Sequence, residues 1–283
     1  MSSTKSSRWA RADHHSGRRE QPLVCPPDHF CDNPPVDQIA YLDRIGLSAP
    51  LQPDLVTLER LQRAHLTAVP FENLDVYERR EVRTDAEWSV TKVVERRRGG
   101  WCFELNGAFA ALLSHLGFEV SRLAATVLYG ETSPMPTHLA IEVQLDRPYL
   151  VDVGFGDSFI RPLPLDSEGP HEGGTGRYGF VFDGGITTLV SWQDDDTMVP
   201  HYRFDRHPHQ LSDFEGASTH LRTHPGLQWT RSRFATRLLD GGPDRVTLLS
   251  DRLKLRRGDV WEEHPVPAED WERLLAEWFG LTP

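Results

Sequence analysis

The sequence predicts an α+β protein with an N-terminal helical bundle, a central antiparallel β-sheet or barrel, and a C-terminal α/β lid. Three observations predict this class. Between residues 36 and 117 apolar residues recur at helical spacing, and from Phe118 the spacing changes to the alternation typical of strands. The last part combines strand-like runs with one amphipathic helix. We therefore expect a helical domain (36–117), a β domain (118–205) and a lid (206–283), preceded by a flexible extension (1–35).

Four helices are expected in the helical domain. The first ends at Gly46, the second before Val69-Pro70, the third before Gly99, and the fourth runs from Cys102 to Gly117. Their apolar stripes are Ile39, Leu42 and Ile45; Leu55, Leu58, Leu61 and Leu66; Trp88, Val90, Val93 and Val94; and Phe103, Leu105, Phe109, Leu112, Leu113 and Leu116.

Alternating apolar residues predict strands after residue 118. Asp183-Gly184-Gly185 separates two such runs and is a strong hairpin signal. The expected strand residues are Val120, Leu123, Ala125, Val127 and Tyr129; Tyr178–Phe182 and Ile186–Val190; and Arg245–Leu249 and Leu253–Arg257. A closing helix follows, and its apolar stripe is expected to pack in the core: Trp271, Leu274, Leu275, Trp278 and Phe279.

Composition excludes several classes of function. The chain has 283 residues and a net charge of −11, which argues against a nucleic-acid surface. No apolar run approaches the ~20 residues of a membrane span, and the polar, basic N-terminus has no apolar core typical of a secretory signal. With only three cysteines, the composition fits a reducing compartment, and we expect a cytoplasmic protein. The sequence gives no signal of oligomeric state.

Two of the cysteines, Cys25 and Cys31, lie in the N-terminal extension. His29 stands between them, but the spacing is not that of a zinc site and further ligands are missing. We therefore expect free thiols there and no metal site.

The run from Arg98 to Asn106 is the most informative about function. Cys102 follows a diglycine and opens a helical pattern. Free backbone N–H groups and the positive end of the helix dipole favour a thiolate there, and the thiolate is the reactive nucleophile. The N–H groups of Cys102 and Phe103 are expected oxyanion donors.

His138 and Asp152 are the expected partners of Cys102. Each lies in a strand-like run, and the short Asp146-Arg147-Pro148 connection predicts a hairpin that places the two strands side by side. Asp152 would orient the imidazole and His138 would hold the thiol proton, as in the Cys-His-Asp core of a cysteine protease. The alternatives are a cysteine that is only a small buried hydrophobe and an aspartate that satisfies backbone amides.

These residues resemble the arylamine N-acetyltransferases. The signature of that family, Arg-Gly-Gly-aromatic-Cys with a following Glu or Gln and an Asn, matches residues 98–106 at every position. Val69–Leu74 resembles its Pro-Phe-Glu-Asn-Leu segment, and Thr137-His138 and Val151–Gly156 resemble the segments that carry its His and Asp. Thr223-His224-Pro225 is similar to a segment near its coenzyme A cleft. The likeness covers residues 36–240.

The resemblance implies a ping-pong acetyltransferase that uses acetyl-coenzyme A as a cosubstrate and has no tightly bound cofactor. Arylamines, arylhydroxylamines or arylhydrazines would accept the acetyl group. It also implies roles for further residues: an acceptor pocket at Phe71, Thr137, Phe155 and Gly156, coenzyme A contacts at Thr223 and His224, and a structural ion pair between Glu72 and Arg98.

The chain departs from the family at two places. Residues 1–35 have no counterpart, and Gly226-Leu227-Gln228-Trp229 stands where a Ser and then a Phe usually follow. Trp229 would take the place of that Phe. For Phe71, Thr137 and Phe155, core packing is the alternative role.

Three other functions stay open at this point. The same three residues would serve a cysteine hydrolase or a transglutaminase-like enzyme acting on an amide. Some relatives within the family are amide synthases that close macrolactams in antibiotic biosynthesis. A non-catalytic binding protein could also retain the scaffold. Acylation of Cys102 by acetyl-coenzyme A without any amine would separate an acetyltransferase from the hydrolase and the transglutaminase-like enzyme. A gene neighbourhood of polyketide synthases would favour the amide synthase, and an unreactive Cys102 would favour the binding protein.

Overall fold

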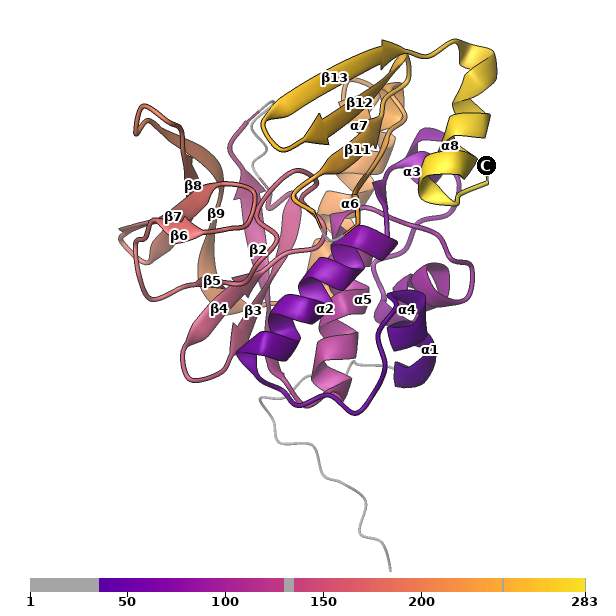
Figure 1. Cartoon of the computed structure of the whole chain (residues 1–283). Coiled ribbons are helices and arrows are strands. Elements are labelled where there is room, and N and C mark those ends of the chain that lie inside the picture. Colours follow the sequence, from indigo (N-terminus) through magenta and orange to yellow (C-terminus); the bar gives the residue numbers. More distant parts are fainter. Residues whose placement is uncertain (1–35, 130–134, 241, 283) are drawn as a thin grey trace, which may run out of the picture. The chain divides into compact units, whose positions relative to one another are not determined.

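The computed structural model describes residues 36–129, 135–240 and 242–282 (Figure 1). These residues belong to one compact unit, residues 32–283. The expected extension 1–35, with Cys25, His29 and Cys31, lies outside the described residues. The three-domain division stays a prediction.

The first part of the unit is helical. Asp37, Asp54 and Asp85 begin three of the helices, and each side chain accepts the backbone N–H three residues on, at 2.8–3.0 Å. The short α3 was not expected. The helices are α1 (Gln38–Arg44), α2 (Leu55–Ala68), α3 (Leu74–Tyr77), α4 (Ala86–Val94) and α5 (Cys102–His115).

The apolar stripe expected in α1 is wrong at one position. Ile39 is 76% exposed, whereas Tyr41 is fully buried beside Leu42 and Ile45. A helix of two turns presents only one stripe to the core, and Ile39 lies outside it. Helix α5 is buried on almost every side because its residues are apolar nearly all round.

Eight antiparallel strands form a barrel-like sheet in the order β5-β4-β3-β2-β9-β8-β7-β6. It nearly closes, since Ile160 N–H, ahead of β5, donates to Gly173 O, just after β6, at 2.7 Å. Gly184 and Gly185 make the expected hairpin turn with positive φ. The strands are β2 (Glu119–Val127), β3 (His138–Gln144), β4 (Pro148–Val151), β5 (Leu163–Pro164), β6 (His171–Glu172), β7 (Arg177–Asp183), β8 (Ile186–Trp192) and β9 (Met198–Pro208).

Strand β3 joins the barrel to the helices. Leu139, Ile141 and Val143 pack with α5 in the helical core, whereas Ala140 points into the apolar interior of the barrel. The alternation of a strand therefore serves two cores at once. It also fixes where His138, the first residue of β3, lies relative to the start of α5.

The last part contains an antiparallel sheet of five strands in the order β1-β10-β11-β12-β13. Its edge strand β1 comes from the helical part of the sequence, and Phe71 pairs with Thr236. Helix α8 covers this sheet with Trp271, Leu275 and Phe279. The strands are β1 (Phe71–Glu72), β10 (Ala235–Leu238), β11 (Arg245–Leu248), β12 (Arg252–Arg257) and β13 (Val260–Pro265).

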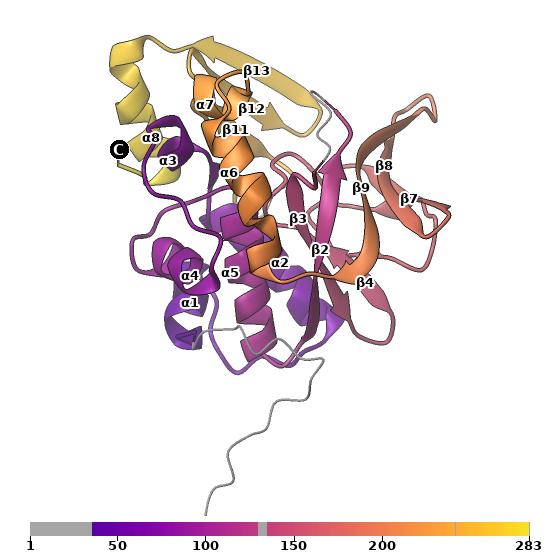
Figure 2. The ribbon, with the colours of Figure 1, turned by 180° about the vertical axis from the view of Figure 1, so that it is seen from behind.

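The remaining helices are short. Helix α6 lies in front in the reversed view of Figure 2, whereas α2 lies in front in Figure 1, so the two lie on opposite faces of the described unit. Phe214, just before α6, packs against Phe103 of α5 with ring centroids 5.7 Å apart. These helices are α6 (Glu215–Thr223), α7 (Gln228–Arg231) and α8 (Trp271–Phe279), with 3-10 turns at η1 (Leu211–Phe214) and η2 (Ala268–Asp270).

Candidate active site

Cys102 is the first residue of α5 and is 3% exposed. The Glu104 side chain reaches back and accepts the N–H of Trp101 at 3.3 Å, which satisfies one free donor of the helix start. Gly99 and Gly100 are required by space: a Cβ on Gly99 would collide with Pro70 O, and one on Gly100 would lie 2.6 Å from Glu104 Oε2. The diglycine thus lets the chain enter α5 beside Pro70.

The loop that follows β4 meets the start of α5 at Gly154. A Cβ there would lie 2.7 Å from Cys102 Cα and 2.9 Å from Asn106 Nδ2. Only glycine allows this approach, and it places Asp152, two residues earlier, next to the cysteine helix.

His138 and Asp152 form a buried pair. His138 Nε2 lies 2.7 Å from Asp152 Oδ2, and the two residues are 2% and 3% exposed. Burial by itself lowers the pKa of His138, but the Asp152 carboxylate and, to a smaller extent, the Cys102 side chain outweigh that effect and raise the pKa from 6.5 to about 10. The imidazole is therefore charged at neutral pH, with Nε2 donating to Asp152.

Two residues that the sequence analysis did not assign complete the surroundings of Asp152. Asn106 Nδ2 donates to Asp152 Oδ1 at 2.8 Å, and the hydroxyl of Tyr202 on β9 donates to Oδ2 at 3.0 Å. Gly154 N–H adds a third donor at 2.9 Å. Asn106 lies one helical turn after Cys102, so the spacing within the motif was a usable signal. Nothing local marks Tyr202.

Thr137 and Phe155 lie beside the cysteine and the histidine. Cys102 Sγ is 3.9 Å from Thr137 O, and the Thr137 hydroxyl accepts the N–H of Val127 at 3.4 Å. The Phe155 ring lies edge-on to His138, with centroids 4.9 Å apart, and remains half-buried. Thus the carbonyl of Thr137, not its side chain, faces the thiol.

Phe71 and Gly156 face one another across the boundary between the two sheets. A Cβ on Gly156 would lie 3.4 Å from Phe71 Cδ1. Phe71 also packs edge-on against Trp229, at 6.1 Å, and Trp229 lies 5.7 Å from Trp101. A cluster of packed aromatic rings therefore extends from Phe71 through Trp229 to Trp101, the residue before Cys102.

Glu72 and Arg98 are brought together at 2.9 Å, but inside a larger buried network. Arg98 also contacts Asp75 at 3.1 Å, and Lys92 contacts Asp75 at 2.7 Å and Glu104 at 2.9 Å. Burial lowers the pKa of Lys92, but these carboxylates raise it more, so the ammonium stays charged. The network connects α3 and α4 to the first turn of α5.

Thr223 and His224 lie at the exposed end of α6. The Thr223 hydroxyl donates to Thr219 O at 2.6 Å, and His224 Nδ1 accepts the N–H of Gly226 at 3.2 Å. Both side chains therefore make hydrogen bonds within their own segment. Among the described residues, neither side chain contacts Cys102, His138 or Asp152.

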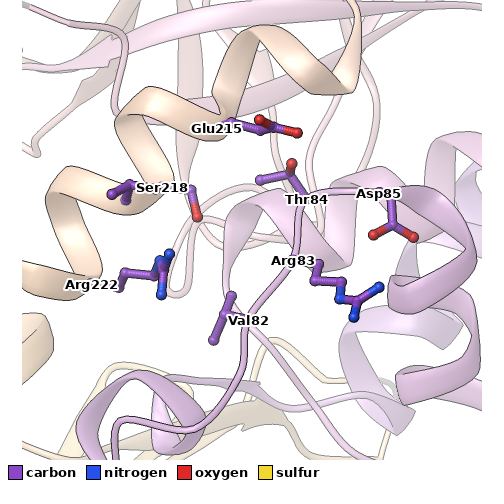
Figure 3. A pocket seen from close by; sticks show the side chains of 8 residues that line it. Val82, Arg83, Thr84, Asp85, Glu215, Ser218 and Arg222 are labelled. Atoms are coloured by element: carbon purple, nitrogen blue, oxygen red, sulfur yellow. The ribbon is translucent and has the colours of Figure 1, made fainter.

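A pocket of about 220 Å³ lies between α6 and the segment that precedes α4, lined partly by Ser218, Arg222 and Arg83 (Figure 3). The lining contains the two acidic residues Asp85 and Glu215 as well as the two arginines, so its charges balance. None of the predicted site residues lines this pocket. Among residues 36–129, 135–240 and 242–282, no group of three or more His, Cys, Asp or Glu side chains could hold a metal ion.

Comparisons with known proteins show the family of the chain. Residues 54–282 match the sequence profile of a family described as N-acetyltransferase. The chain is 37% identical, over 236 residues, to an arylamine N-acetyltransferase of Mycolicibacterium smegmatis, covering 80% of this chain and 85% of that protein.

Solved structures are similar as well. The arylamine N-acetyltransferase from Salmonella typhimurium superposes with a TM-score of 0.81 at 29% identity, covering 86% of this chain and 90% of that one. The enzyme from Mycobacterium marinum, solved in complex with CoA, gives 0.79 at 31% identity, covering 86% and 92%.

The mixed fold, with its nearly closed barrel-like sheet packed on helices, is that of a known class of acyltransferases. The chain belongs to the arylamine N-acetyltransferase family. The resemblance noted in the sequence is thereby confirmed. Within the part of the chain that the structure describes, no helix combines the length and apolar character needed to cross a membrane.

Proposed function

We propose that the protein transfers an acetyl group from acetyl-coenzyme A to an aromatic amine by a ping-pong route through a thioester on Cys102. The observation that carries the proposal is the position of His138, which is hydrogen-bonded to Asp152, lies beside Cys102 and has a pKa raised to about 10. A charged imidazole beside a cysteine favours the thiolate, which is the nucleophilic form.

In the first half-reaction, Cys102 Sγ attacks the thioester carbonyl of acetyl-coenzyme A. The backbone N–H groups of Cys102 and Phe103 are free at the helix start and stabilise the oxyanion. The carbon–sulfur bond to coenzyme A breaks, its thiolate takes the proton from His138, and the acetyl group stays on Cys102. His138 is then neutral and can act as a base.

In the second half-reaction, the amine nitrogen attacks the acetyl carbonyl on Cys102. His138 accepts a proton from the nitrogen, the bond to Sγ breaks, and the thiolate–imidazolium pair is restored. Phe155 packs on His138, and Gly156 packs on Phe71; we propose that these residues border the site of the aryl ring. Arylhydroxylamines and arylhydrazines present the same ring and a similar nucleophilic nitrogen.

Coenzyme A is the expected cosubstrate, and the CoA complex of the M. marinum enzyme supports it by similarity. Thr223 and His224 are the proposed contacts, although the Thr223 hydroxyl would first have to leave Thr219 O. A cytoplasmic location stays a prediction.

Mass spectrometry of the intact protein tests the proposal. Incubation with acetyl-coenzyme A alone should add one acetyl group, located on Cys102 by peptide mapping. Addition of 4-methoxyaniline should remove the group and release the N-acetylated amine. If the acetylated protein loses the acetyl group only to water, the protein is a hydrolase. If Cys102 is never acetylated, the protein is a non-catalytic binding protein.

A further inference from the structure

Asp157 lies directly after Gly156 in the loop that follows β4, and it faces two arginines of the five-stranded sheet. Arg245 on β11 places Nε 3.2 Å from Asp157 Oδ1, and Arg256 on β12 places Nη1 2.9 Å from the same oxygen. A loop of the barrel is thus joined by two ion pairs to neighbouring strands of the other sheet.

The buried guanidinium of Arg245 has the Asp157 carboxylate as its counter-charge. The residue is 2% exposed, and burial lowers its pKa to about 10 despite the opposing effect of Asp157. Arg245 Nη1 donates a hydrogen bond to Thr236 Oγ1, at 3.2 Å, while Nε and Nη2 have no hydrogen-bond partner within the described residues. A buried guanidinium without a counter-charge is costly, so the position of Arg245 favours a loop that brings Asp157 to it.

The same sheet carries Phe71. Strand β1 is hydrogen-bonded to β10, which is followed by β11 and β12. Gly156, next to Asp157, packs on the Phe71 ring, and Phe155 packs on His138. The two ion pairs therefore join the loop that carries Phe155 and Gly156 to the sheet that carries Phe71.

We propose that Asp157 is a positioning residue for the acceptor amine. Held by Arg245 and Arg256, it sets the separation of Phe155 and Gly156 from Phe71, and with it the fit of an aryl ring beside acetylated Cys102. This inference rests on the proposed function. Asp157 contacts neither Cys102 nor His138, so the acetylation of Cys102 by acetyl-coenzyme A is independent of it.

Separate measurement of the two half-reactions of Asp157→Asn tests the proposal. The second half-reaction, started from acetylated protein and varied 4-methoxyaniline, should show a raised acceptor KM, with kcat/KM lower by on the order of tenfold to a hundredfold, as expected for a misplaced substrate. The rate of Cys102 acetylation should equal that of the parent.

Two further variants address folding and rescue. Arg256→Met breaks the partly exposed ion pair without leaving a buried charge unpaired, and it should raise the acceptor KM in the same direction. Asp157→Glu, which keeps the charge, should restore much of the loss. Asp166→Asn, which removes the exposed ion pair of Asp166 with Arg147 on the outside of the barrel part, is the matched control and should leave both half-reactions unchanged.

The outcomes are distinguishable. If the parent protein never acetylates Cys102, the proposed function fails and this inference fails with it. If the parent is active but Asp157→Asn lowers only the melting temperature, or slows both half-reactions equally, Asp157 is a structural residue and the inference alone is overturned.

Discussion

Asn106 donates from Nδ2 to Asp152 Oδ1 at 2.8 Å, so the helix that carries Cys102 also holds the carboxylate that is hydrogen-bonded to His138. The Asn106 side-chain oxygen accepts the N–H of Val153 at 2.9 Å, and Nδ2 also donates to Leu139 O at 2.6 Å. One amide side chain therefore fixes α5, the end of β4 and β3 together. The three proposed catalytic residues share a single rigid support.

Replacement of the nucleophile tests its assignment. Cys102→Ser should abolish acetyl transfer while the fold is kept, because a serine hydroxyl is a far weaker acid and a weaker nucleophile than a cysteine thiol. Initial rates measure the loss of transfer, and circular dichroism measures whether the fold is kept. Cys25→Ser and Cys31→Ser should retain the parent rate, and a full loss of turnover in either would show that the nucleophile was wrongly chosen.

Asp152→Asn should slow alkylation of Cys102 by iodoacetamide at neutral pH. The carboxylate raises the pKa of His138 to about 10, so the ring stays protonated until the pH rises through that value. Without the charge, burial lowers the pKa of His138, the ring is neutral at pH 7, and the thiolate loses its partner.

Tyr202→Phe is the matched control for that variant. It removes one hydrogen bond to Asp152, of 3.0 Å, but keeps the carboxylate. Its alkylation rate should fall less than that of Asp152→Asn. Identical pH profiles for Asp152→Asn and the parent would reduce Asp152 to a structural role.

Gly154→Ala should destabilise the protein by about 1–3 kcal/mol and reduce transfer, because overpacking forces backbone shifts of that cost. The added Cβ would lie 2.7 Å from Cys102 Cα. Gly216→Ala in α6 is the control, since its Cβ meets nothing within 4 Å, and it should stabilise the helix by roughly 0.5–1 kcal/mol. Urea unfolding and initial rates measure both variants. Equal stability of the two variants would contradict the close approach.

His65 should make the protein sensitive to acid. Burial, with a smaller effect of Arg44, lowers the pKa of His65 from 6.5 to about 3, so the folded ring stays neutral beside the Tyr41 hydroxyl. The unfolded chain binds the proton below pH 6.5, so the stabilisation is complete above that pH and is lost as the pH falls towards 3.

Comparison with His65→Gln isolates this effect. Between neutral pH and about pH 5 the parent should lose about 2 kcal/mol more unfolding free energy than the variant, from the linkage of one proton. Urea unfolding at both pH values gives the four free energies. A parent and a variant that lose the same amount would show that His65 titrates normally in the folded state.

Deletion of residues 1–30 should leave the melting temperature and the transfer rate close to those of the full chain. The segment has few large apolar residues with which to build a core. Differential scanning calorimetry of the two proteins measures this. A marked drop in melting temperature would mean that the extension packs on the folded part.

Local patterns sufficed for much of the fold. The helical stripe behind Cys102 and the Asp-Gly-Gly turn predicted α5 and the hairpin of β7 and β8, and the structure has both. Signals of this kind are complete within a few residues, since spacing, caps and turn residues act locally. The signature around Cys102 also identified the family, which the comparisons confirm.

The sequence by itself determined the long helices, several of the strands, the cysteine motif and the family. The tertiary structure alone decided which distant residues meet: the pairing of Phe71 with Thr236, the contact of Tyr202 with Asp152, and the ion pair of Asp157 with Arg245. No periodicity records these contacts, because each partner satisfies a charge, a hydrogen bond or a strand edge that becomes available only after the chain has packed.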